Sequence, residues 1–189
     1  MILHLKLILI LITPLIFQSC ENGKTNKKRN GLIVYQEAQI SWSRNFNPLS
    51  PAGSTRWPTK CGIHEPLFVY NSMTAKWVPW LAVDHKWNSD NTILKMYIRK
   101  NVFWSDGQPF SAKDVAFTTQ IKKKFRALDT RNSWEYLDEV TAINDSIVQY
   151  KFNRVNVPGF DALATQAIVP KHIWEKVEDP VKFLNSNPV

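Results

Sequence analysis

Residues 94–128 read LKMYIRKNVFWSDGQPFSAKDVAFTTQIKKKFRAL, and this stretch contains the strongest structural signals of the chain. Leu94, Met96 and Ile98 alternate with more polar neighbours, which is the two-residue period of a strand with one buried face. Ser-Asp-Gly at 105–107 supplies a flexible backbone and side-chain acceptors, and a proline two residues later prevents a return to a β-ladder. We therefore predict a strand that ends in a tight turn.

A helix start follows this turn. Ser111 is suited to the N-cap, Asp114 completes a capping box three residues later, and Phe110 and Val115 are placed as a hydrophobic staple. The next apolar residues share one narrow helical face: Phe117, Ile121, Phe125 and Leu128. The basic run at 122–126 points elsewhere, so we expect it to be solvated. The stretch predicts strand, turn and capped helix, and it contains no obvious catalytic group.

Residues 95–117 closely resemble a signature of one protein family, the bacterial extracellular solute-binding proteins of family 5. Its consensus reads lRkgvkWsDGxPftAxDVvft, and further blocks of the family occur in the same order at 45–51, 62–70, 76–82, 134–140, 168–174 and 187–189. One departure is His64, which stands where an aromatic residue is usual. The family comprises the peptide, nickel and oligosaccharide receptors of ABC importers.

The resemblance implies an α/β fold of the type II periplasmic-binding-protein kind, with two lobes, of which this chain holds the N-terminal part. Family members are roughly two to three times longer than these 189 residues, so we expect a fragment. The family pattern assigns 31–48 to the first strand of the large lobe. It assigns 49–166 to an α+β small lobe and 167–189 to the truncated return to the large lobe.

Two smaller elements are predicted inside the small lobe. Residues 140–152 alternate in strand fashion on both sides of Asn144-Asp145-Ser146, which predicts a hairpin. Pro158 and Gly159 precede a short helix at 160–165.

The first 20 residues are typical of an export signal. An apolar run at 7–17 follows Lys6, is too short to span a bilayer and is interrupted by Pro14. The segment ends Phe-Gln-Ser-Cys, which resembles the lipobox of bacterial lipoproteins, so we expect lipidation of Cys20 and a membrane anchor. Residues 21–30 are polar and basic and are expected to form a flexible tether. We therefore expect an exported protein at the periplasmic or cell surface.

Composition argues against several other classes. The chain is 44% hydrophobic, which is enough for a packed core, and its net charge of +8 is concentrated near 24–29 and in the 122–126 run. No nucleic-acid motif accompanies these clusters, so no nucleic-acid partner is expected. Cys61 and His64 lack further metal ligands at a useful spacing, and no nucleophile elbow, phosphate loop or HExxH is present. We predict a monomeric binding protein without metal, cofactor or catalytic residue.

Candidate ligand contacts come from two regions. The residues that leave the expected strand at 32–35 approach the ligand cleft in the family, although a plain connecting loop is equally compatible with the sequence. Tryptophans in irregular segments can stack on a sugar ring or line a pocket, and the family segment at 134–136 overhangs the cleft. We therefore predict ligand contacts from Gln36, Glu37, Ala38, Trp57, Trp134 and Tyr136.

The resemblance implies capture of an oligopeptide by two closing lobes and its delivery to the permease subunits of an ABC importer. Main-chain hydrogen bonds near 36–38 would provide affinity without side-chain selection. The abundance of tryptophan makes a cello-oligosaccharide or another short oligosaccharide the alternative ligand. A secreted enzyme or a sensor on the same fold is a less favoured reading, because fold does not fix function.

Overall fold

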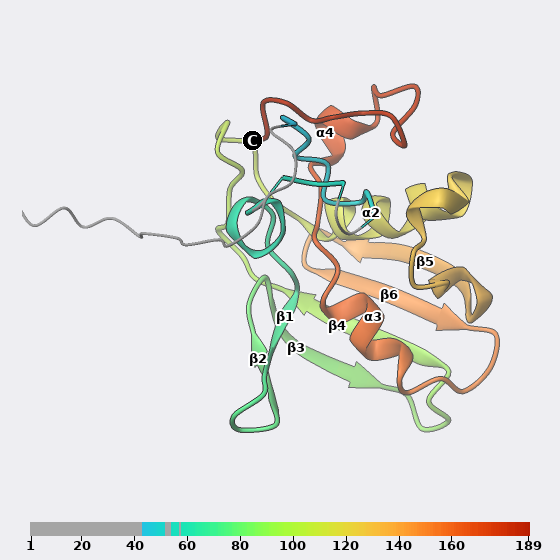
Figure 1. Ribbon diagram of the computed structural model, residues 1–189. Coiled ribbons are helices and arrows are strands. Elements are labelled where there is room, and N and C mark those ends of the chain that lie inside the picture. The colour runs from blue at the N-terminus through green and yellow to red at the C-terminus, as the bar shows by residue number, and fades with distance from the viewer. Residues whose placement is uncertain (1–42, 52–53, 57) are drawn as a thin grey trace, which may run out of the picture. The chain divides into compact units, whose positions relative to one another are not determined.

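The computed structural model describes residues 43–51, 54–56 and 58–189, all within one compact unit (Figure 1). The predicted export signal, the tether and the expected strand at 32–35 lie outside the described residues. The strands are β1 (Phe68–Asn71), β2 (Lys76–Pro79), β3 (Ala82–Trp87), β4 (Ile93–Ile98), β5 (Leu137–Asn144) and β6 (Ile147–Phe152). The helices and helical turns are η2 (Thr59–Ile63), α2 (Ala112–Lys124), η3 (Arg126–Leu128), η4 (Ser133–Glu135), α3 (Gly159–Ala164) and α4 (Lys171–Trp174).

Four strands form an antiparallel sheet in the order β3-β4-β6-β5, and β1 pairs with β2 in a separate hairpin. Within the sheet Leu94 pairs with Tyr150, and Met96 pairs with Val148. All four side chains are fully buried, whereas Lys95 between them is exposed. The alternation predicted for the strand at 94–98 is confirmed.

The turn after β4 is built as the sequence predicts. Gly107 has a φ of 84°, a left-handed conformation that other residues rarely adopt. Its N–H donates to the Trp104 carbonyl at 2.9 Å, and the Asp106 carboxylate accepts from the Gln108 N–H at 3.1 Å. These bonds reverse the chain and direct it toward α2.

The start of α2 is also confirmed. The Ser111 hydroxyl accepts from the Lys113 N–H at 3.2 Å, and the Asp114 carboxylate accepts from the Ser111 N–H at 2.9 Å. The helix ends at Lys124, however, before the end of the apolar face predicted to reach Leu128. Phe125 leaves the helical region with φ −117° and ψ 83°, and the chain tightens into η3.

The buried surface of α2 faces two hydrophobic clusters. Ala112, Val115 and Ala116 pack in the main cluster, which also contains buried residues of β4, β6 and α3. The predicted apolar face packs instead in a second cluster, formed by Leu49, Phe117, Ile121, Phe125, Leu128, Val169, Ile173, Trp174 and Phe183. The helix therefore joins the sheet on one side to the last part of the chain on the other.

The predicted hairpin and short helix are present. β5 and β6 pair around a turn at 145–146, where the Asn144 side chain accepts from the Ser146 N–H at 2.9 Å. The helix predicted at 160–165 is α3, displaced by one residue.

Residues 167–189 are packed onto the segment predicted as a small lobe. The Ile168 N–H donates to the Glu65 carbonyl at 3.3 Å, and the Val169 N–H donates to the Thr118 hydroxyl at 3.1 Å. Val169 and Trp174 also pack in one buried cluster with Leu49 and Ile121. The described residues on both sides of position 166 thus share their cores, and the division into lobes at this position stays a prediction.

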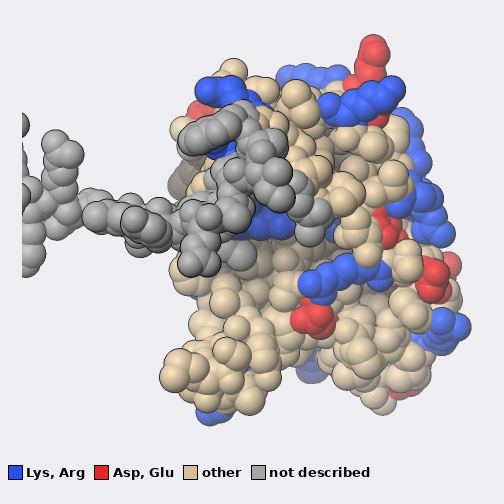
Figure 2. Space-filling model, viewed as in Figure 1, with Lys and Arg blue, Asp and Glu red and all other residues tan. Residues whose placement is uncertain are grey.

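The β1–β2 hairpin carries a largely uncharged surface, which forms the tan lobe at the lower left of Figure 2. Tyr70, Met73 and Trp80 on or beside it are 50%, 96% and 46% exposed. No helix in the described ranges combines the length and apolar character needed to cross a membrane.

Candidate functional site

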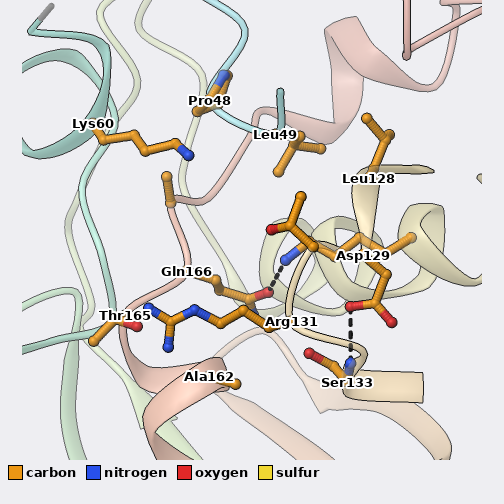
Figure 3. Close-up of a pocket in the computed structure, with 13 residues that line it drawn as sticks. Pro48, Leu49, Lys60, Leu128, Asp129, Arg131, Ser133, Ala162, Thr165 and Gln166 are labelled. Atoms are coloured by element: carbon orange, nitrogen blue, oxygen red, sulfur yellow. Dashed lines mark hydrogen bonds between the residues drawn. The ribbon is translucent and has the colours of Figure 1, made fainter. Parts of the chain in front are cut away.

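A cavity of about 130 Å³ lies between η2, the end of α2, the η3–η4 loop and α3 (Figure 3). Its walls come from segments far apart in the sequence, which only the folded chain brings together. The lining residues are Pro48, Leu49, Lys60, Lys122, Leu128, Asp129, Thr130, Arg131, Ser133, Ala162, Thr165, Gln166 and Ala167.

The floor of this cavity is a short hydrogen-bond chain. The Lys122 amino group donates to the Gln166 side-chain oxygen at 2.8 Å, and the Gln166 amide donates to the Thr119 hydroxyl at 3.0 Å. Burial lowers the pKa of Lys122 to about 8; the Asp129 carboxylate raises it, and the charges of Lys60 and Arg131 lower it further. The amino group is therefore still mostly protonated at neutral pH.

The position of Lys122 corrects the expectation that the whole basic run is solvated. Lys123 and Lys124 are exposed, but Lys122 is half-buried because it follows Thr118 and Thr119 by four and three residues on the inward face of α2. This spacing in the sequence could have predicted that Lys122 is partly buried. The prediction requires knowing that Thr118 and Thr119 face the interior.

The η3–η4 loop is held in place by one buried carboxylate. Asp129 is 5% exposed, and its two oxygens accept from the N–H groups of Ser133 at 2.9 Å and Trp134 at 3.0 Å. Arg131, at the tip of the loop, forms an ion pair with Asp161 of α3 at 2.7 Å. The loop therefore presents Arg131 to the cavity from a fixed backbone, as Figure 3 shows.

A second cavity of about 180 Å³ adjoins the first and shares Arg131, Ser133 and Ala162 with it. Tyr136 lines this second cavity, and the Arg154 guanidinium lies 4.7 Å from the centre of its ring. The rest of its lining is more apolar and comes from Leu137, Phe152, Asn156, Pro158, Gly159 and Leu163.

The structure separates the two predicted aromatic contacts. Trp134 is 8% exposed, and its indole N–H donates to the Thr119 carbonyl at 2.9 Å, while the Lys123 amino group lies 4.6 Å from its ring. Trp134 therefore packs against α2, and Tyr136 faces the second cavity. Gln36, Glu37, Ala38, Trp57 and the lipidation site Cys20 lie outside the described residues.

Two histidines outside these two cavities have structural partners. His64 is fully buried, with Nδ1 3.1 Å from the Ile168 carbonyl and Nε2 3.3 Å from the Asn185 side-chain amide. His172 Nε2 lies 2.7 Å from the Asp106 carboxylate, and this hydrogen bond lowers the pKa of Asp106. In the part of the chain that the structure describes, no three His, Cys, Asp or Glu side chains gather as a metal site.

Comparison with known proteins gives a consistent result. A family model described as bacterial extracellular solute-binding proteins, family 5 Middle, matches residues 76–189. A protein of Deinococcus radiodurans described as a probable ABC transporter-binding protein is 24% identical, and the match covers 77% of this chain and 28% of that protein.

Solved structures of similar fold include a periplasmic oligopeptide-binding protein of Thermotoga maritima with bound mannohexaose. It is 32% identical with a TM-score of 0.70, over 77% of this chain and 27% of that one. An oligopeptide-binding protein of Bacillus subtilis in complex with a nonapeptide is 24% identical with a TM-score of 0.62, over 72% and 27%. The chain thus spans little more than a quarter of the length of these relatives.

Proposed function

Because this chain belongs to the bacterial extracellular solute-binding proteins of family 5, we propose that it captures oligopeptides outside the cytoplasmic membrane for an ABC importer. The observation that carries the proposal is the family match over 76–189, which includes the whole motif at 95–117. The 32% identical Thermotoga maritima relative, described as a periplasmic oligopeptide-binding protein, supports a peptide as the ligand. The family consists of solute-binding proteins and not of enzymes.

The proposal includes export and anchoring. A member of an extracellular family acts outside the cytoplasm, and lipidation of Cys20 would hold the protein at the membrane beside the permease. The ligand contacts proposed are Gln36, Glu37, Ala38, Trp57, Trp134 and Tyr136. The structure describes two of these residues, Trp134 and Tyr136. Tyr136 has the more accessible ring, because Trp134 is buried in the core.

Short oligosaccharides are the second candidate ligand class. The Thermotoga maritima relative is described with mannohexaose bound, at 32% identity to this chain. A sugar would be held by stacking on aromatic rings and by uncharged hydrogen bonds, so its affinity would change little with salt. A peptide carries charged termini, and its affinity would fall as salt screens them.

Isothermal titration calorimetry on the full-length protein separates these ligands. We expect heat from a mixed pool of short peptides, weaker binding at 0.5 M sodium chloride, and no heat from manno- or cello-oligosaccharides. Tyr136→Leu should weaken peptide binding, whereas Tyr97→Leu on β4, away from both cavities, should not. Binding heat with the sugars alone would mean that the ligand is an oligosaccharide. The absence of binding heat with both pools would refute solute capture.

A further inference from the structure

The amino group of Lys122 is a partly buried cation that the proposed transport function does not use. An ammonium group has three N–H donors, and one of them is directed to the neutral Gln166 side-chain oxygen at 2.8 Å. Lys122 takes part in none of the ion pairs among the described residues. Removing a charge from water is costly unless an opposite charge compensates it, so this position favours an anion.

The lining of the cavity around Lys122 is positive. Lys60 and Arg131 border the same space, and Figure 3 shows the Lys60 amino group directed into it. Among the described residues of the lining, Asp129 is the single carboxylate, and its oxygens already accept the N–H groups of Ser133 and Trp134. Arg131 pairs with Asp161 through one nitrogen, and its guanidinium has five N–H donors in all.

The size of the cavity restricts the anion. A volume of about 10–15 Å³ on this measure is enough for one water molecule, and the cavity offers about 130 Å³. This space admits a small planar or tetrahedral oxyanion and is too small for a peptide. Hydrogen bonds between charged nitrogen donors and anionic oxygens are about twice as strong as neutral ones.

We propose that this cavity binds a small oxyanion, either inorganic phosphate or a carboxylate group, with the Lys122 amino group as its partly buried cationic ligand. The neutral Gln166 side chain fixes the direction of that amino group from below. The Lys60 and Arg131 side chains supply further donors from η2 and from the η3–η4 loop. Oxyanion binding at this site requires neither a transported solute nor a permease. The proposal can therefore be tested independently of peptide binding.

Thermal unfolding of the complete 189-residue chain tests the proposal at pH 7 with sodium phosphate, sodium acetate or sodium chloride at equal ionic strength. Lys122→Met removes the proposed ligand. Lys124→Met makes the same change on the exposed side of the same helix. We expect phosphate, acetate or both to raise Tm along a one-site binding curve in the wild type and in Lys124→Met. In Lys122→Met the affinity should fall at least tenfold.

The salts also distinguish the source of the oxyanion. A response to phosphate alone indicates a free inorganic ion, and a response to acetate indicates the carboxylate of an organic ligand. Phosphate stabilises many proteins by exclusion from their surface. Equal gains in Tm for all three chains would therefore overturn the proposal, as would no gain in any of them.

A measurement on the wild type keeps the test decisive if Lys122→Met does not fold. Biosynthetic incorporation of lysine labelled with ¹³C at Cε gives each lysine a methylene signal and leaves the three N–H donors of its amino group intact. The Lys122 signal is identified by its absence in Lys122→Arg, and the Lys124 signal by its absence in Lys124→Arg. Phosphate or acetate should shift the Lys122 signal in a saturable manner and leave the Lys124 signal in place. An unmoved Lys122 signal would overturn the site.

Discussion

At the scale of single residues, His64 illustrates how packing selects a protonation state. Its Nδ1 contacts the Ile168 carbonyl and must donate, so its Nε2 is the acceptor for the Asn185 amide. The ring therefore joins three separate segments only as the neutral Nδ1–H form. Burial lowers the pKa of His64 to about 4, against an opposing effect of the Ile168 hydrogen bond.

This pKa predicts a loss of stability in acid. Between pH 6.5 and about 4 the unfolded chain binds a proton at His64 and the folded chain does not, so the free energy of unfolding falls as the pH falls through this window. The shift is worth about 3 kcal/mol. His64→Phe is less stable near neutral pH because it loses both hydrogen bonds, and its deficit relative to the wild type should shrink by that amount near pH 4.

Urea unfolding across this pH range provides the measurement. His85→Gln serves as the control, because it leaves His64 in place and should retain the acid-dependent loss. A constant difference between wild type and His64→Phe from pH 7 to 4 would show that His64 is not the titrating group.

At the scale of elements, the first turn of α2 does more than begin a helix. One oxygen of the Asp114 carboxylate accepts from the Ser111 N–H, and the other accepts from the Lys171 N–H at the start of α4, at 2.9 Å in each case. A local capping residue thus also holds a segment 57 positions later in the chain. The sequence motif indicates the first contact and gives no sign of the second.

Asp114→Ala should therefore lower the free energy of unfolding by more than the loss of an ordinary helix cap does. Loss of the cap costs about 0.5–2 kcal/mol, and the unpaired Lys171 N–H adds about 1–3 kcal/mol. Ser111→Ala removes only the local contact and should cost about 1 kcal/mol. Equal losses for the two variants in urea unfolding would mean that the bond to Lys171 contributes nothing measurable.

The β1–β2 turn contains a residue in an unfavourable conformation. Ala75 has a φ of 53°, which glycine adopts without the steric penalty that alanine carries. Ala75→Gly should stabilise the chain by about 0.5 kcal/mol, because relief of this penalty exceeds the added entropy of the unfolded state. Ala127→Gly in η3, where φ is not positive, should lower Tm instead. A lower Tm for both variants would contradict the prediction.

At the scale of the whole molecule, the described part of the chain combines helices with an antiparallel sheet, which is the α+β arrangement that the family resemblance implies for the small lobe, and the family assignment is confirmed. Its stability depends on residues beyond position 166. Ile168, Val169 and Trp174 are almost completely buried, and the last two form the second cluster with α2. A domain boundary drawn from motifs at this position crosses a continuous packed interior.

A chain that ends at Gln166 should therefore fail to fold cooperatively. Each buried apolar side chain contributes roughly 1.5–3 kcal/mol, so the three missing residues represent about 5–9 kcal/mol against a typical net stability of 5–15 kcal/mol. Near-ultraviolet circular dichroism during heating should show no sharp transition. A chain without residues 187–189 should melt like the wild type. A sharp transition in the chain ending at Gln166 would establish an independent small lobe.

Features that depend on near neighbours could be predicted from the sequence. The strand of Leu94 and Met96, the turn at Gly107 and the cap at Ser111 follow from periodicity, backbone freedom and hydrogen bonds that span a few residues. Each is present in the structure as expected. The family resemblance likewise rests on the order of local blocks, and it identified the class of protein without showing where any ligand contacts this chain.

The burial of Trp134, the half-buried position of Lys122 and the cavity above it depend on long-range packing and could not be predicted. Lys60, Lys122 and Gln166 lie more than 40 residues apart along the chain, and the α2 residue that binds Trp134 is 15 positions away. Whether a tryptophan or a lysine in such a position meets solvent or protein depends on which distant segment packs against it. Local sequence patterns do not predict this burial, because the free energy that favours it comes from contacts that form only when the chain is folded.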